Sequence, residues 1–98
     1  MEIRQKREGA TLTIEIEGRI DTFTAPELGK VIDNGLDGVT RLIFDLKDMD
    51  YTSSAGLREF LKAQQIMEDQ GSLLVRNANE TVLDIFDETG FSSILDIE

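Results

Sequence analysis

The sequence contains no cysteine and no histidine. Without cysteine, the chain can form no disulfide, no thiolate metal site and no cysteine nucleophile. Without histidine, it cannot build a Ser-His-acid or Cys-His mechanism, because both need a base that titrates near neutral pH. A Gly-Lys-Ser or Gly-Lys-Thr phosphate-binding loop is also missing. These absences argue against an enzyme, and we expect no catalytic residue, no cofactor and no metal.

Basic residues are scarce as well. Ten Lys and Arg stand against twenty Asp and Glu, which gives a net charge of −10. Such a charge repels nucleic-acid phosphates and anionic lipids, although it is compatible with a basic protein partner. No apolar stretch approaches the roughly 18 residues of a membrane-spanning helix, and the N-terminal sequence has no signal-peptide core. We therefore expect a cytoplasmic protein that binds neither nucleic acid nor membrane.

The first third of the chain predicts a hairpin followed by a helix. Residues 3–7 and 11–17 flank Glu8-Gly9, and the second segment alternates strictly between polar and apolar residues, as a strand with one buried face does. The sequence Thr24-Ala25-Pro26-Glu27 has the form of a capping box at the start of a helix. The apolar residues of this helix are Leu28, Val31, Ile32 and Leu36, and Gly35 and Gly38 lie where it would end.

The middle of the chain predicts a strand, a helix and a second strand. Residues Leu42–Leu46 are apolar with one interruption, which is typical of a central strand covered on both faces, and we expect helices to cover it. A helix from about Ser54 to Asp69 follows and ends at Gly71, and Leu73–Val75 returns as a strand. The apolar stripe of this helix consists of Leu57, Phe60, Leu61, Ala63 and Met67.

The last quarter of the chain predicts a third helix and a short strand. Either Asn77 or Asn79 can cap the helix, and Gly90 lies just beyond its last apolar turn. Residues Ser93–Ile97 are expected to form the strand. The order is then β-β-α-β-α-β-α-β, an α/β fold with a mixed β-sheet and helices packed on it, in which the crossover strands pair in parallel.

A pair of serines, Ser53 and Ser54, lies at the predicted junction between a strand and a helix. The first amides of a helix lack intrahelical partners and carry partial positive charge. A serine hydroxyl at this position can cap the helix or, when phosphorylated, hold a dianion there. The residues alone leave both roles open, and capping is the simpler of the two.

The acidic residues around this junction suggest three other kinds of site. The spacing from Asp48 and Asp50 to Glu59 resembles a calcium-binding loop, but serine replaces the required glycine and the preceding segment is β-type. Asp45 could serve an aspartyl-phosphate receiver, but the other acidic residues of such a site are missing. Asp21, Asp48 and Asp50 could form an acid/base pair of a small enzyme, although solvated loop acids explain them more simply.

Four segments in this order and spacing resemble the STAS domain and, more narrowly, the bacterial anti-sigma factor antagonists. They are Gly18–Asp21, Leu42–Leu46, Tyr51–Arg58 and Ile85–Phe91. The resemblance extends over nearly the whole chain and implies a single STAS domain over residues 1–98 without catalytic activity. It also implies that the protein binds an anti-sigma factor that is a serine protein kinase, frees a sigma factor for transcription, and is released by phosphorylation. We expect a serine phosphatase to reverse the modification.

The resemblance also assigns the site. The phosphoacceptor of the family precedes a small residue and then Gly-Leu, which corresponds to Ser54 in this sequence. Asp21 corresponds to a position near the phosphorylation loop, and we expect the Asp48–Gly56 loop to lie beside it. The expected partner-binding residues are Asp21, Asp48, Asp50, Thr52, Ser53 and Gly56.

Two features of the resemblance leave alternatives open. STAS domains also occur as scaffold or sensor modules in stress-signalling complexes, which is the second function we consider. Many relatives carry a further C-terminal helix, whereas this sequence ends at Glu98. A weak homodimer would cover the surface on which that helix lies in those relatives.

Overall fold

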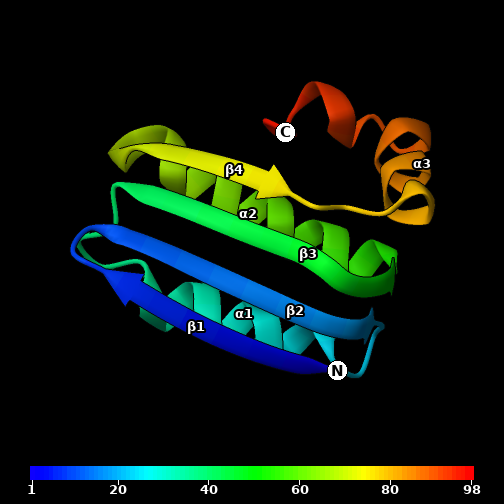
Figure 1. Cartoon of the computed structure of the whole chain (residues 1–98), viewed down its shortest axis with the longest axis horizontal. Coiled ribbons are helices and arrows are strands. Elements are labelled where there is room, and N and C mark those ends of the chain that lie inside the picture. The colour runs from blue at the N-terminus through cyan, green and yellow to red at the C-terminus, as the bar shows by residue number, and fades with distance from the viewer.

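A four-stranded mixed sheet carries two long helices on one face and leaves most of its other face without helices (Figure 1). This arrangement comes from a computed structural model of residues 1–98. The elements in chain order are β1 (Glu2–Glu8), β2 (Thr11–Ile20), α1 (Ala25–Gly35), β3 (Arg41–Thr52), α2 (Ser54–Gln70), β4 (Ser72–Arg76), α3 (Glu80–Glu88) and a 3₁₀ turn, η1 (Phe91–Ser93).

The strands lie in the order β1-β2-β3-β4. β1 and β2 pair antiparallel, which confirms the predicted hairpin, whereas β2 with β3 and β3 with β4 pair in parallel. Helices α1 and α2 make the two crossovers that parallel neighbours require. The predicted central position of Leu42–Leu46 is therefore confirmed, because β3 has a partner on each side.

The core lies between the sheet and the helices. Alternate residues of the strands face α1 and α2, among them Ile14 of β2 and Phe44 of β3. The rings of Phe44 and Phe60 meet edge to face with centroids 4.9 Å apart, and Phe60 meets Phe86 in the same way at 6.0 Å. This aromatic series joins β3, α2 and α3 in one core.

The expectation that helices cover both faces of the central strand is wrong. Helices α1 and α2 lie on the same side of the sheet (Figure 1). Ile43 and Asp45 point to the opposite face and are buried there without a helix above them. Strands β2 and β4 flank them closely, and the Arg76 guanidinium lies against the Asp45 carboxylate, with Nε 3.3 Å from Oδ2. Side chains of neighbouring strands can thus bury a strand residue as completely as an overlying helix would.

The last predicted strand, Ser93–Ile97, is also wrong, so the observed order is β-β-α-β-α-β-α. Gly90 has a left-handed backbone (φ +82°), and the 3₁₀ turn that follows takes up residues 91–93. Only one bridge, between Val75 and Ile97, links this segment to the sheet. The segment is too short, once the turn is made, to form more than that bridge.

The helix ends follow the predicted chemistry in two cases. Asn79 caps α3, because its Oδ1 accepts the Val82 N–H at 2.9 Å, while Asn77 has φ +62° and donates its amide to Asp45. Gly71 follows the last residue of α2, as expected. None of the helices combines the length and the apolar content that crossing a membrane requires.

Candidate functional site

The ends of β2 and β3 lie side by side and lead into two helical turns. The Ser53 N–H donates to the Ile20 carbonyl at 2.9 Å, so the residue after β3 is tied to the last residue of β2. Asp21 follows β2, and Ser54 begins α2. The predicted proximity of Asp21 to the serine pair is therefore present in the fold, at the right-hand end of the sheet in Figure 1.

The two serines have different roles at the start of α2. Ser53 is the N-cap residue, with extended backbone (φ −82°, ψ 175°), and its Oγ accepts the Gly56 N–H over a long 3.5 Å contact. Ser54 is the first residue of the helix and is exposed. Its hydroxyl makes no hydrogen bond with any other group of the protein. The structure thus gives the capping role to Ser53 and leaves the Ser54 hydroxyl free.

This division predicts that the two serines differ in their effect on stability. Ser53→Ala removes the cap and should lower the free energy of unfolding by about 0.5–1 kcal/mol, at the lower end of capping effects because the contact is long. Ser54→Ala should change it by less than about 0.5 kcal/mol, as at other exposed positions. Urea denaturation of both variants measures the difference. A larger loss for Ser54→Ala than for Ser53→Ala would contradict the assignment of the cap.

Close packing holds the start of α2 against the sheet. Gly56 and Thr52 are buried, and Thr52 retains only 2% of its surface. A Cβ atom added to Gly56 would overlap Thr52 Oγ1 and would lie 2.8 Å from Cγ2 of Ile20. Only glycine fits this position. Gly56 and Thr52 therefore lie beneath the surface around Ser54 and set its position.

Asp21 closes the turn that precedes α1. Its Oδ1 accepts the N–H groups of Phe23 and Thr24, both at 2.9 Å, and its carbonyl accepts the Ala25 N–H at 2.9 Å. The capping box predicted around Thr24 is wrong, because Thr24 already has helical backbone angles and its side chain makes no cap bond. Thr24 Oγ1 accepts the Asp21 N–H instead. Of the two amides that a capping box would satisfy, the Thr24 N–H donates to Asp21 Oδ1 and the Glu27 N–H donates to the Thr24 carbonyl at 2.9 Å.

These hydrogen bonds also fix the charge of Asp21. The Thr24 N–H has the largest effect on the Asp21 carboxyl and lowers its pKa. Desolvation opposes it, but hydrogen bonds from the Phe23 N–H and the Thr24 hydroxyl add to the lowering, so the pKa lies below its ordinary value. Asp21 therefore carries its negative charge throughout the neutral pH range. A negative charge on Ser54 would be introduced next to Ser53, which is hydrogen-bonded to Ile20, the residue that precedes this anion.

The remaining acidic residues lie on strand β3, so the loop predicted over Asp48–Gly56 is wrong. β3 continues to Thr52 because it stays paired with β2. The pairing has two irregularities, one of them next to Gly18 (φ +89°), and after them the two strands pair again as far as Ile20 and Thr52. Asp48 lies on the face opposite the helices, where its carboxylate is 3.9 Å from Arg4. Asp50 is exposed and makes no ion pair.

The other three kinds of site suggested by the sequence do not assemble. The calcium-type spacing runs from strand β3 into helix α2 and forms no loop. No three acidic side chains come close enough together to hold a metal ion. Burial alone would raise the pKa of Asp45, but hydrogen bonds from Asn77, the Lys47 N–H and Arg76 outweigh it and lower the pKa, so this carboxylate is a structural link between β3 and the residues after β4.

Two aromatic side chains near the site escaped the sequence analysis. Phe23, in the Asp21 turn, exposes 89% of its surface, and Tyr51, near the end of β3, exposes 40%. The Arg19 guanidinium lies over the Tyr51 ring, 5.1 Å from its centroid. The sequence shows Phe23 only as an aromatic residue between two polar ones in a turn. This pattern does not distinguish an exposed ring from a buried one.

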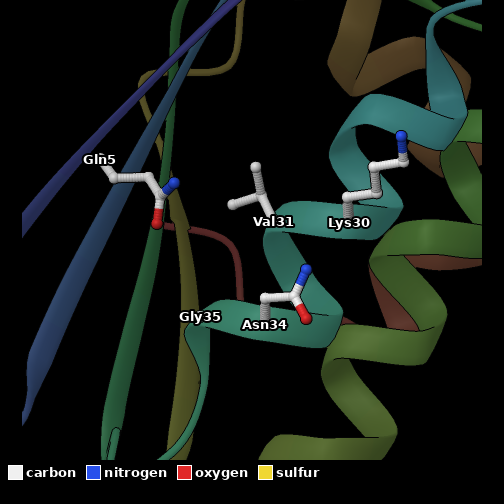
Figure 2. A pocket seen from close by; sticks show the side chains of 5 residues that line it. All are labelled: Gln5, Lys30, Val31, Asn34 and Gly35. Carbon is white, nitrogen blue, oxygen red and sulfur yellow. The ribbon is translucent and has the colours of Figure 1, made fainter.

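The hollows of the surface lie away from Ser54. One, of about 280 Å³, is formed by Gln5 on β1 and by the second half of α1 (Figure 2). The other, of about 290 Å³, lies on the sheet face opposite the helices and is lined by Lys6, Glu8, Thr11, Thr13, Glu15, Ile43 and Arg76. No hollow therefore lies at Ser54, which suits contact with another protein better than enclosure of a small molecule.

Comparisons with known proteins agree with this description. The profile of the STAS domain family matches residues 2–98. The anti-sigma-B factor antagonist of Bacillus subtilis is 33% identical over 87 residues, which are 88% of this chain and 80% of that protein.

Solved structures show the same fold. An anti-sigma factor antagonist from Mycobacterium paratuberculosis superposes with a TM-score of 0.88 at 18% identity, over 98% of this chain and 83% of that one. The phosphorylated form of the Bacillus cell fate determinant SpoIIAA superposes with a TM-score of 0.70 at 17% identity, over 99% of this chain and 91% of that one. The sheet order and the helix positions described above are thus those of a fold already known.

Proposed function

Because the chain belongs to the STAS domain family, among the anti-sigma factor antagonists, we propose that it binds an anti-sigma factor serine kinase and that phosphorylation of Ser54 ends this binding. An antagonist of this kind acts by binding and not by catalysis. When the chain is unmodified it occupies the anti-sigma factor, and a sigma factor is free to direct transcription. A serine phosphatase returns the modified chain to its binding state, and the whole cycle takes place in the cytoplasm.

The free hydroxyl of Ser54 is the observation that carries this proposal. It is exposed at the first position of α2, while the adjacent Ser53 makes the cap. A kinase can therefore reach the hydroxyl without breaking a bond of the fold. The phosphate would lie at a helix N-terminus, where unpaired amides and the helix dipole favour an anion.

The charge around Ser54 explains how phosphorylation would end binding. A phosphoserine adds about 1.5 to 2 negative charges near neutral pH. In a complex this dianion would be removed from water and would lie beside the ionised Asp21. The free chain keeps the phosphate in water, so the modification disfavours the complex much more than the fold.

Phosphopeptide mapping tests the proposal. The kinase is recovered with the chain from lysate of the source cell, with and without phosphatase treatment, and is then purified and incubated with the chain and ATP. We expect one phosphate, on Ser54, and we expect the modified chain to dissociate. Ser54→Ala should remain bound in the presence of ATP, whereas Ser53→Ala, the matched control, should still be modified. A phosphate on Ser53 or Thr52, or recovery of no kinase, would contradict the proposal.

A further inference from the structure

We propose that Phe23 is the apolar anchor with which this chain docks on the anti-sigma factor kinase. The inference rests on the proposed function and adds the residue that supplies the affinity. Phe23 is the most exposed of the three large hydrophobic side chains at the surface, with 89% of its area in water against 43% for Ile94 and 40% for Tyr51. An aromatic ring in this position contributes nothing to the core, and its burial by a partner is favourable.

The turn that carries Phe23 is well fixed. The Phe23 N–H donates to Asp21 Oδ1, and the next two residues, Thr24 and Ala25, donate to Asp21 as well. The backbone therefore keeps one conformation while the ring points into water. Binding through such a residue loses little conformational entropy, because only the side chain has to be ordered.

The position of Phe23 lies within the area that the kinase must cover. The kinase has to bring a phosphoryl group into contact with the Ser54 hydroxyl, and a standard interface buries about 800 Å² on each partner, which extends roughly 16 Å from its centre. Ser53 is hydrogen-bonded to Ile20 at 2.9 Å, and Phe23 is two residues beyond Asp21, within about 8 Å of it along the chain. A kinase centred on Ser54 therefore contacts the Asp21 turn.

The other two exposed hydrophobic residues are less suited to this role. The Tyr51 ring is already covered on one face by Arg19. Ile94 belongs to the C-terminal segment, which bridges to β4 at the edge of the sheet opposite β1 (Figure 1). Ile94 is therefore a matched control, an exposed hydrophobic residue on a different segment from the Asp21 turn.

The residues of the turn also indicate what kind of surface the kinase would present to it. The ring requires an apolar pocket, and the ionised Asp21 beside it favours basic groups at the rim of that pocket. The contribution of the ring depends little on salt, because hydrophobic burial is not screened as charge pairs are. The Phe23 ring would contact the kinase both in the resting complex and in the complex that undergoes phosphorylation. Loss of the ring should therefore raise KM and leave kcat unchanged.

The experiment compares Phe23→Ala with Ile94→Ala, using the kinase recovered with the wild-type chain and then purified. For Phe23→Ala we expect a Kd about 30-fold higher by calorimetry, as for a central anchor residue. We also expect KM for Ser54 phosphorylation to rise by a similar factor, kcat to stay within twofold, and the melting temperature to stay within about 2 °C. Ile94→Ala should bind within threefold of the wild type. Phe23→Leu should recover part of the affinity.

Other results would overturn the inference. If Phe23→Ala binds within threefold of the wild type while Ser54 is phosphorylated normally, the anchor role is wrong and the proposed function stands. If kcat falls and KM does not rise, Phe23 orients the acceptor and does not supply affinity. If Ile94→Ala weakens binding as much as Phe23→Ala, affinity does not depend on this turn. If the wild-type chain binds no kinase, the proposed function fails and the inference fails with it.

Discussion

Replacing Ser54 with aspartate should weaken binding to the proposed anti-sigma factor partner by at least about 100-fold, which corresponds to roughly 2.7 kcal/mol, and should leave the fold intact. The new carboxylate lies at the first position of α2, next to a turn whose Asp21 is already ionised. In the complex the two anions would lie in a desolvated interface, where their repulsion is stronger than at a solvent-exposed surface. In the free chain the same carboxylate faces the N-terminus of a helix, which favours it by about 0.3–1 kcal/mol.

Calorimetric titration of the kinase gives the loss of affinity, and urea denaturation gives the stability. Ser54→Asn is the matched control, since it has nearly the size of aspartate without the charge. We expect it to bind within about tenfold of the wild type. If Ser54→Asn loses as much affinity as Ser54→Asp, size and not charge controls the complex. If Ser54→Asp loses its cooperative unfolding transition, the hydroxyl is needed for the fold, and the simple capping account is the better one.

Gly56→Ala should lower the free energy of unfolding by about 2–3 kcal/mol, the range typical of overpacked cores. In most helix positions the same substitution stabilises the protein, because alanine in a helix is more favourable than glycine by about 1 kcal/mol. Here we expect a loss of stability instead. At this position the added methyl would overlap Thr52 Oγ1 and would lie 2.8 Å from Cγ2 of Ile20. Both neighbours are buried side chains at the ends of strands, so neither can move away without disturbing the core.

The matched control is Gly35→Ala, at the last residue of α1, where the added Cβ would be 3.4 Å from the Gln5 side chain and would meet no backbone atom. We expect a change of less than about 0.5 kcal/mol for this variant. Urea denaturation of both proteins measures the difference. Combining Gly56→Ala with Thr52→Ala should recover part of the lost stability, since the two side chains compete for one space. A Gly56→Ala protein as stable as the wild type would show that the start of α2 adjusts freely.

Gly56→Ala also tests whether this packing sets the position of the Ser54 hydroxyl, apart from its effect on stability. The methyl would push the first turn of α2 away from the sheet and would take the Ser54 hydroxyl with it. We therefore expect phosphorylation to slow even at temperatures where the variant is fully folded. Close packing far below the surface thus sets the position of an exposed hydroxyl.

Much of the fold was accessible from local sequence patterns. The strict alternation of residues 11–17 and the helical stripe from Leu57 to Met67 each report a regular element with one buried face, and both elements are present. Gly71 and Asn79 mark helix ends by backbone and capping chemistry that depends only on neighbouring residues. The assignment of Ser54 came instead from the resemblance of the surrounding segments to a known family, because capping and phosphorylation require the same kind of helix start.

Two of the errors involve residues that are distant in sequence. The predicted strand stopped at Leu46 because Lys47 and Asp48 break the apolar run, and only pairing with β2 across a bulge carries β3 on to Thr52. The burial of Ile43 comes from neighbouring strands and not from a helix. Periodicity carries no information about such pairings. The error at Thr24 is local: the sequence fits a capping box, but the Asp21 carboxylate accepts the Thr24 N–H and the Thr24 carbonyl accepts the Glu27 N–H.

The division of roles between the two serines affects the lifetime of the protein in the cell. Proteases degrade a small domain mainly through its transiently opened forms, whose population depends on the free energy of unfolding. Ser53, and not Ser54, makes the cap, so phosphorylation of Ser54 removes no bond that holds α2 closed. The modified form should therefore be degraded no faster than the unmodified one. In the proposed cycle, the same molecules would then pass through many rounds of modification without being replaced by new synthesis.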